Sequence, residues 1–422
     1  SSDMSNGSVI YETTDQSIVE YTKGSVEEGQ IKYYFLGVKD AWGLQSLSEI
    51  KEGNSYTKFM TQYGGSNHQE GYSVIQTSDG GYVVTGYGGH NLWLVKTDSK
   101  GIVERNNNFD NGSEQAKGYE SQETDDGGYI VAGYNWAYSN AVGNFAWILK
   151  TTPELWEEWN KTLAPNDDRG RAHSVQQTSD GGYIVAGYFE ESSDDESLFI
   201  YKTDASGDKE WYKYFRGDYP NVQQHFDSGY RVIQSSDGGY VVAGVAGNDA
   251  WLIKTDSNGE TEFDKTYGGS NDENIYDVQE TNGGYVLVGT EKTTSGGHYY
   301  NAYVVITNSS GDMVIEKTYG GEHDDDFQSV VQTSDGGFTM VGYTKSYGSH
   351  SDKDLWIMKI DANGNEEWSR VIGSNDDLDQ QAYCIKQTSD GGYIISGTTS
   401  SVDAGLNLLL IKTDPSGRVI IE

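Results

Sequence analysis

The chain has 422 residues and carries 29 basic against 65 acidic side chains, which gives a formal net charge of −36. A surface this acidic repels phosphate groups, so nucleic acid and anionic membranes are not expected partners. The sequence contains no run of eighteen apolar residues, so no transmembrane helix is expected. The single cysteine, Cys384, rules out a disulfide within one chain and is expected to be a small buried apolar residue.

The N-terminal residues are polar and carry no strong structural pattern. Residues 1–7 (SSDMSNG) have the composition of a remnant left after a leader peptide is removed. The protein is therefore expected to be exported, either extracellular or on the cell surface. Residues 8–11 suit a short strand, so residues 1–16 are interpreted as a leader or closing strand and residues 17–422 as one domain.

A four-residue signature recurs along the rest of the chain. It reads Asp-Gly-Gly-Tyr at Asp79 and returns with small changes about every 52 residues, starting at Asp126, Asp180, Asp237, Asn282, Asp335 and Asp390. This period is typical of four-stranded propeller blades and is longer than helical or leucine-rich repeats. The sequence therefore predicts a repeat protein built from blades.

Each repeat contains four short apolar runs separated by Gly, Asp, Asn or Ser. The second run is largely apolar and β-branched, as expected for a strand buried on both faces, and no run has helical periodicity. The Thr-Ser-Asp-Gly-Gly and Lys-Thr-Asp-x-x-Gly segments between runs have the composition of tight turns. Their Asp and Gly residues are therefore interpreted as structural.

Large aromatic residues recur in the third and fourth runs. A large ring at the same point of every blade suits packing between neighbouring blades, so these rings are expected in the core. They are Trp93, Trp147, Trp251 and Trp356 in the third run, and Trp159, Trp211, Phe263 and Trp368 in the fourth.

The number of blades depends on residues 29–65. Residues 29–37 stand where a second strand is expected, residues 40–42 match residues 249–251, and residues 55–65 match a fourth strand with its Tyr-Gly-Gly exit. With this worn copy included, the chain is predicted to be all-β, an eight-bladed β-propeller of four-stranded antiparallel blades, whose last strand finishes at residues 418–422. The alternative is seven blades plus a divergent N-terminal segment.

The repeat resembles the propeller repeats of secreted and surface-anchored proteins of bacteria and archaea. Those repeats read TSDGGYIVAG, then WLIKTDSNG, then EW-K-YGG, and the match is close at residues 178–187, 255–259 and 265–269. It covers the chain from about residue 27, at the repeat length typical of propeller blades. The resemblance implies an extracytoplasmic propeller, often of unassigned function, and identifies no catalytic residue.

The loops between second and third strands vary in length and are expected to share one rim with the blade crossings. Rigid scaffolds with variable loops commonly carry binding surfaces. Aromatic residues in small polar loops are suited to bind glycan or protein, although some rings are expected to close their own loops. The candidate ligand-binding residues are His90, Trp136, Tyr138, Phe145, His298, Tyr299, Tyr300, Tyr347 and His350.

Carboxylates and histidines gather in the same loops and crossings. Clustered carboxylate oxygens suit calcium, although exposed turns explain them equally well. The candidate metal ligands are Asp272, Asp324, Asp325, Asp326, Asp376 and Asp377. All seven histidines are expected on this rim, without the close spacing of a zinc site; they are His68, His90, His173, His225, His298, His323 and His350.

These observations leave three functional classes open. The favoured one is a monomeric, non-enzymatic binding module that recognises glycan or extracellular protein through the variable rim, requires no cofactor and is assisted by calcium. The alternatives are a glycan-active enzyme on a propeller scaffold and a structural or assembly subunit. The 65 carboxylates are too many for spacing alone to identify a catalytic pair.

Overall fold

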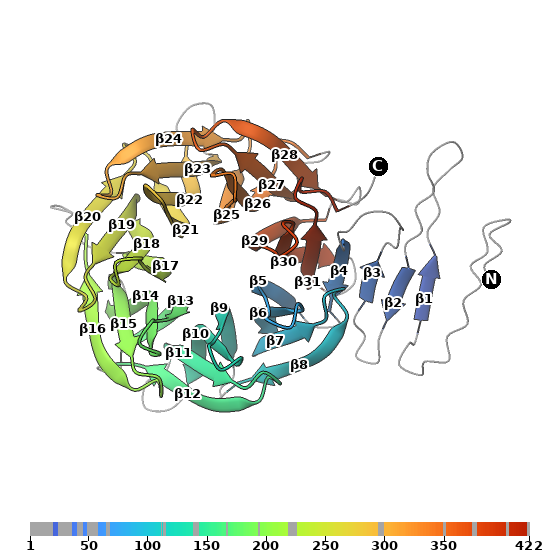
Figure 1. Cartoon of the computed structure of the whole chain (residues 1–422), viewed down its shortest axis with the longest axis horizontal. Coiled ribbons are helices and arrows are strands. Elements are labelled where there is room, and N and C mark those ends of the chain that lie inside the picture. The colour runs from blue at the N-terminus through green and yellow to red at the C-terminus, as the bar shows by residue number, and fades with distance from the viewer. Residues whose placement is uncertain are drawn as a thin grey trace.

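The computed structural model shows antiparallel sheets arranged around a central axis (Figure 1). It describes strand residues 20–23, 36–39 and 45–48, and residues 58–419 apart from 65–67, 111, 113–114, 138–142, 166–167, 193–194, 218–225, 294–298, 349–351, 374–377 and 402–404. Within this part of the chain no helix is long and apolar enough to cross a membrane.

The sheets form seven blades, and in each blade the first strand of the repeat is the innermost. The first four blades are β5 (Gln69–Gln76), β6 (Tyr82–Gly88), β7 (Asn91–Thr97) and β8 (Val103–Phe109); β9 (Ala116–Glu123), β10 (Tyr129–Ala137), β11 (Gly143–Thr151) and β12 (Glu157–Leu163); β13 (Arg169–Gln177), β14 (Tyr183–Ser192), β15 (Asp195–Thr203) and β16 (Lys209–Phe215); and β17 (Ser228–Gln234), β18 (Tyr240–Ala246), β19 (Asp249–Thr255) and β20 (Thr261–Tyr267). The last three are β21 (Glu273–Thr281), β22 (Gly284–Lys292), β23 (Tyr300–Thr307) and β24 (Met313–Tyr319); β25 (Asp325–Gln332), β26 (Phe338–Thr344), β27 (Asp354–Ile360) and β28 (Glu366–Ile372); and β29 (Gln380–Gln387), β30 (Tyr393–Ser401), β31 (Gly405–Thr413) and β4 (Phe59–Tyr63).

The prediction of eight blades is wrong, and the alternative of seven blades is confirmed. The fourth strand of the last blade is β4, which pairs antiparallel with β31 from Leu408 opposite Tyr63 to Lys412 opposite Phe59. Residues 420–422, at the end of the strand that was expected there, lie outside the described residues. The ring is therefore closed by a strand from the other end of the chain. Residues 1–16 and 40–42, which were expected to form a leader or closing strand and part of the worn copy, lie outside the described residues.

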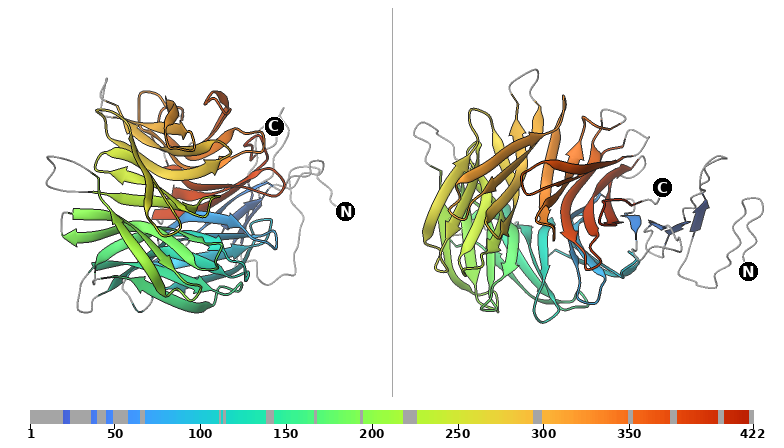
Figure 2. Two further views of the ribbon diagram at one scale, coloured as in Figure 1. Left: turned by 60° about the vertical axis from the view of Figure 1, so that its left-hand side comes forward. Right: turned by 45° about the horizontal axis from the view of Figure 1, so that its top comes forward.

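Three further strands extend the closing sheet outward. They are β1 (Glu20–Lys23), β2 (Leu36–Lys39) and β3 (Gln45–Ser48), and the order in the sheet is β1-β2-β3-β4-β31-β30-β29. Figures 1 and 2 show them to one side of the ring. The N-terminal segment thus supplies four strands as its repeat pattern suggested, but its fourth strand completes another blade.

The predicted structural role of the turn residues is confirmed in detail in the blade β17–β20. Asp237 accepts hydrogen bonds from the hydroxyl of Ser235 at 2.6 Å and from the N–H of Gly239 at 2.9 Å. The ammonium group of Lys254, on the third strand, lies 2.9 Å from the same carboxylate. The Ser235 hydroxyl and Lys254 together lower the pKa of Asp237 to about 2, and Gly238 adopts a φ of 89° that an L side chain disfavours.

The core lies between neighbouring blades. One cluster joins Leu94 and Val83 of the first blade to Tyr129 and Trp147 of the second, and each of these side chains is 1% exposed or less. The third-strand tryptophans Trp93, Trp147, Trp251 and Trp356 are all buried, as predicted, and so is Cys384. Each blade therefore buries its face on the next, which fixes the inner strands around the axis.

Hydrogen bonds between blades define two rims. On the loop rim, the loop after the second strand meets the next blade crossing, where the N–H of Ala116 donates to the carbonyl of His90 at 2.8 Å. On the turn rim, the first turn of one blade meets the end of the next inner strand, where the N–H of Ser78 donates to Glu123 at 2.8 Å. Every inner strand runs from the loop rim to the turn rim.

Candidate functional site

The inner strands of all seven blades line an axial channel. Each of these strands contains a β-bulge, at which one residue is skipped by the pairing with the second strand. A bulge redirects the side chain of the extra residue and is frequent beside binding and active sites. We call the seven bulge residues the axial collar; they are Tyr72, Tyr119, His173, Tyr230, Tyr276, Gln328 and Tyr383.

The repeated glycine near the end of the second strand explains why the bulge forms in every blade. A Cβ atom at Gly187 would lie 1.9 Å from the carbonyl oxygen of Arg171 on the bulged strand, and one at Gly133 would lie 1.8 Å from the carbonyl oxygen of Lys117. No other residue fits so close an approach of two backbones. The last glycine of the TSDGGYIVAG pattern is therefore the sequence mark of the bulge, and through it of the collar.

Six collar rings form a continuous arc around the axis. Neighbouring ring centroids are 5.1–5.5 Å apart in the order Tyr383, Tyr72, Tyr119, His173, Tyr230 and Tyr276. The rings of His173 and Tyr230 are stacked with an angle of 14° between their planes. Gln328 fills the remaining place in the circle, and all seven side chains are half-buried.

The collar carries no charge near neutral pH. Burial raises the pKa of Tyr119 to about 12 and lowers the pKa of His173 to about 4. The tyrosines therefore stay protonated and the imidazole stays neutral. This surface offers aromatic faces together with neutral hydrogen-bonding groups.

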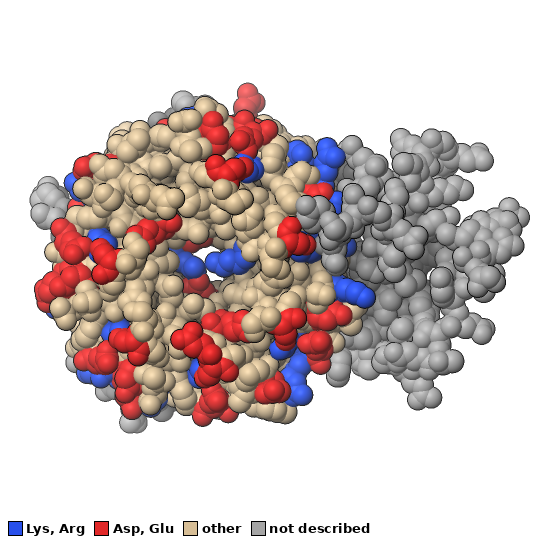
Figure 3. All heavy atoms as spheres, in the orientation of Figure 1, with Lys and Arg blue, Asp and Glu red and all other residues tan. Residues whose placement is uncertain are grey.

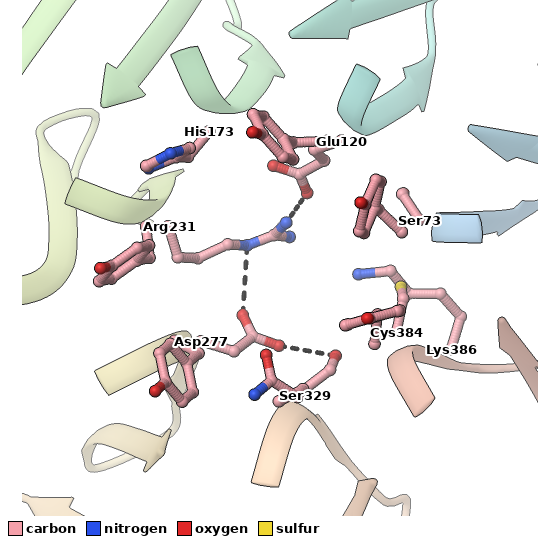
Figure 4. A pocket seen from close by; sticks show the side chains of 14 residues that line it. Ser73, Glu120, His173, Arg231, Asp277, Ser329, Cys384 and Lys386 are labelled. Atoms are coloured by element: carbon pink, nitrogen blue, oxygen red, sulfur yellow. Dashed lines mark hydrogen bonds and ion pairs between the residues drawn. The ribbon is translucent and has the colours of Figure 1, made fainter. Parts of the chain in front are cut away.

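A second layer, one residue closer to the turn rim, joins three blades across the channel. Arg231 forms ion pairs with Glu120 and, at 3.3 Å, with Asp277, as Figure 4 shows. Glu120 also accepts from the hydroxyl of Ser174 at 2.5 Å, and Asp277 accepts from the hydroxyl of Ser329 at 2.9 Å. We call Glu120, Arg231 and Asp277 the axial brace.

Three cations lie against tyrosine rings on the loop-rim side of the collar. The ammonium group of Lys117 lies 4.6 Å from the ring centroid of Tyr87, and the guanidinium carbon of Arg171 lies 4.8 Å from that of Tyr134. Lys353 approaches the ring of Tyr343 to 4.0 Å. These distances are in the range of cation–π contacts, so the entrance to the collar combines aromatic faces with positive charge on a protein of net charge −36.

The channel is narrow at the collar and wider toward the turn rim. The cavity between collar and brace measures about 90 Å³, and a second cavity on the turn-rim side of the brace measures about 300 Å³. Small-molecule sites usually measure roughly 300–1,000 Å³. A ligand at the collar is therefore expected to lie against the rings from the loop rim and not to be enclosed between collar and brace.

The structure places the predicted ligand-binding residues at separate points of the loop rim. His90 is exposed and has a φ of 93°, while Trp136, Tyr299 and Tyr300 are half-buried. Phe145 is 8% exposed, and Tyr347 donates to the carbonyl of Gly320 at 2.5 Å. Tyr138, His298 and His350 lie outside the described residues.

The predicted metal ligands that the structure describes are engaged within the protein. Asp272 pairs with Lys292, and Asp324 lies 3.4 Å from Lys345. Asp325 accepts from Ser346 at 2.6 Å, and Asp326 accepts from the N–H of Tyr343 at 2.8 Å. Among the described residues, no three His, Cys, Asp or Glu side chains are grouped to hold a metal ion; Asp376 and Asp377 are outside that part of the chain.

The collar and the brace were missed by the sequence analysis. The expectation that His173 lies with the other histidines on the variable rim is corrected, because it belongs to the inner strand β13 and stacks in the collar. The available signal was a Tyr or His seven residues before the Asp of most turn signatures, as for Tyr72 and Asp79. Side chains of a strand point alternately to its two faces, so without knowledge of the bulge the sequence did not show that this side chain points toward the axis.

Comparisons with known proteins add information on the fold. No protein-family model and no curated protein matches the sequence. Among solved structures, the polysaccharide lyase Uly1 aligns with a TM-score of 0.50 at 11% identity, over 86% of this chain and 93% of that one. YCF48 bound to D1 peptide aligns with a TM-score of 0.49 at 11% identity, over 86% and 97%.

A protein of unknown function from Dyadobacter fermentans aligns with a TM-score of 0.46 at 12% identity, over 83% of this chain and 96% of that one. At such identities the likeness concerns the fold alone. The resemblance to repeats of exported bacterial and archaeal proteins stays a prediction. The seven four-stranded blades around one axis identify the fold of the chain as a β-propeller.

Proposed function

We propose that the protein is a binding module that recognises an extended polar ligand, with a glycan favoured over a protein, at the loop-rim end of the channel. The axial collar carries this proposal. Seven blades each project one side chain to the same level, and six of these side chains are rings in an unbroken arc.

The chemistry of the collar suits a sugar chain. Aromatic faces stack on the apolar faces of sugar rings, while tyrosine hydroxyl groups and the amide of Gln328 supply hydrogen bonds to sugar hydroxyls. The cations Arg171 and Lys353 at the entrance favour sugars that carry carboxylate groups, whereas Lys117 is already paired with Glu70 at 3.1 Å. Acidic glycans are therefore the first ligands to examine.

The state of the axial carboxylates favours binding over catalysis. Glycoside hydrolysis commonly needs two carboxyl groups, one of which must donate a proton. Glu120 and Asp277 are instead held by Arg231, by serine hydroxyls and by the backbone N–H groups of Val175 and Val330. Both carboxyl groups are thus engaged in contacts within the protein.

One carboxyl group keeps a glycan-active enzyme as the second candidate. Asp326 is 4% exposed, and burial raises its pKa to about 7, a value suited to a general acid or base. It accepts a hydrogen bond from the collar residue Gln328 at 2.8 Å. Release of reducing sugar by the wild type that is lost in Asp326→Asn would establish this alternative.

A glycan array that includes polyuronates tests the proposal, and it is read once with calcium and once with a chelator. Binding that survives the chelator and is lost in Tyr119→Ala and Tyr276→Ala is expected. Trp156→Ala is the matched control, because Trp156 is 58% exposed in a turn-rim turn. Glycan binding that is equal in collar and control variants would contradict the proposal, and binding that requires calcium would point to the acidic crossings instead.

A further inference from the structure

The turn-rim half of the axial channel is a second chamber, which shares Arg231, Asp277 and Lys386 with the smaller cavity between collar and brace. It measures about 300 Å³ and lies beyond the axial brace as seen from the collar. Its lining includes Arg231, Asp277, Lys386, Gln176 and Gln279, together with apolar side chains such as Ile233. The chamber is therefore polar at several points and large enough for a small molecule.

Hydrogen-bond acceptors of the brace are already occupied. One oxygen of Asp277 accepts from Ser329 at 2.9 Å and from the N–H of Val330 at 3.0 Å, while the other accepts from the N–H of Val278 at 2.9 Å and faces Arg231. Glu120 is similarly engaged by Ser174 and Arg231. The carboxylates beside the chamber thus have little capacity left for further donors.

Three of the side chains that line the chamber have hydrogen-bond donors that are not occupied. Lys386 has no hydrogen-bond or ion-pair partner among the described residues, and Figure 4 shows its side chain directed toward the axis and Arg231. Gln176 and Gln279 use their Oε1 atoms to accept from the N–H groups of Gln234 and Gln332, both at 2.6 Å. Their NH₂ groups therefore stay available as donors.

The balance of charges in the chamber also favours an anionic ligand. The charged residues that line the chamber are the cations Arg231 and Lys386 and the carboxylates Asp277 and Glu280, so the chamber is neutral within a chain of net charge −36. Glu280 accepts hydrogen bonds from the N–H and the hydroxyl of Ser236. Figure 3 shows Lys and Arg atoms inside the central opening, while Asp and Glu are spread over the surrounding face. The axis is thus the place on this face where an anion meets the least repulsion.

We propose that this chamber binds a small oxygen-rich anion, a carboxylate or a phosphate, through Lys386 and the amide groups of Gln176 and Gln279. An ammonium group without a partner and two amide donors on three different blades suit an oxyanion better than a neutral or cationic ligand. The site lies on the opposite side of the brace from the collar. It therefore does not depend on the proposed function.

Isothermal titration calorimetry of the full chain with inorganic phosphate and with D-glucuronate tests the site. Saturable binding of at least one anion is expected, and Lys386→Met should weaken it at least about tenfold because a charged hydrogen bond is lost. Lys386→Arg should retain binding. Binding of phosphate alone or of glucuronate alone would identify the anion class, and either result supports the site.

Lys100→Met is the matched control, since Lys100 is exposed on a turn and the substitution changes the net charge equally. It should bind as the wild type does. Lys386→Gln, which keeps a polar side chain, serves as a second variant and should also lose affinity. The proposal is overturned if the wild type binds neither anion, or if Lys386→Met and Lys386→Gln bind as tightly as Lys100→Met.

Discussion

Substitution of Arg231 by methionine tests the energetic role of the axial brace. Glu120 and Asp277 are only 9% and 7% exposed, and Arg231 is the cation paired with both. Removal of one partner from a buried ion pair costs roughly 3–5 kcal/mol, because an uncompensated charge stays buried. Here each carboxylate keeps a serine hydroxyl and a backbone N–H, so the lower end of this range, about 3 kcal/mol, is expected.

A cost of this size is measurable by thermal unfolding. An unfolding entropy of roughly 2.1 cal/mol/K per residue over 422 residues gives about 0.9 kcal/mol/K. A loss of about 3 kcal/mol then lowers Tm by about 3 °C if the ring unfolds as one unit. Differential scanning calorimetry of the wild type and Arg231→Met gives the difference directly.

A triple variant without charges distinguishes two effects: the loss of attraction within the brace and the cost of leaving an unpaired charge buried. Glu120→Gln/Arg231→Met/Asp277→Asn removes all three charges and should recover most of the lost Tm, since replacing a whole buried ionic group is frequently neutral. The reasoning is refuted if Arg231→Met has the wild-type Tm, or if the triple variant is as unstable as the single one.

Three further outcomes follow from the fold. Burial raises the folded-state pKa of Asp326 above its ordinary value to about 7, so its contribution to stability is complete at acidic pH and is lost as pH rises through 7. Asp326→Asn should therefore raise the urea midpoint at pH 8 more than at pH 5, and an equal change at both would contradict this. A chain that starts at residue 58 should keep the closed ring. A chain that starts at residue 68 lacks β4 and should lose hydrogen-exchange protection in β31. If β31 keeps its protection in the shorter chain, the ring is closed by a contact other than the pairing of β31 with β4. Gly187→Ala should lower the free energy of unfolding by about 3 kcal/mol, because its Cβ overpacks against Arg171. Gly269→Ala should be tolerated, because a Cβ there meets no atom within 4 Å. Equal urea midpoints for the two variants would contradict the steric explanation of the bulge.

Local features of the repeat were predictable because they depend on neighbouring residues. The turn of Asp237 and Gly238, the buried Trp251 and the four strands per repeat all follow from the composition and spacing of one unit. Such patterns recur in each blade and reinforce one another. The all-β propeller class could therefore be predicted from the sequence.

The number of blades was not predictable in the same way. β4 resembles a fourth strand, but whether it completes its own blade or the last one depends on pairing with β31, about 350 residues away. Repeat periodicity contains no information on that partner. The repeat pattern therefore predicted a separate N-terminal blade, although the fourth strand of that copy completes the last blade and closes the ring.

The candidate site shows a similar limit. Tyr119 and Tyr276 belong to strands recognised from sequence, but their direction toward the axis follows from a bulge imposed by the glycine of the neighbouring strand. The variable length of the loops instead indicated rim residues such as Trp136 and Tyr300. Their role as ligand contacts stays a prediction. The collar becomes apparent only when all seven inner strands are seen together around the axis.

The affinity of the collar variants for the glycan selected on the array is the most direct test of the account. Tyr119→Ala and Tyr276→Ala should each weaken binding about tenfold, because a stacking surface of roughly 1–1.5 kcal/mol is removed. Trp156→Ala should bind as the wild type does. Unchanged affinity in both collar variants, together with a loss in Trp136→Ala or Tyr300→Ala, would contradict an axial site and place recognition on the outer loops.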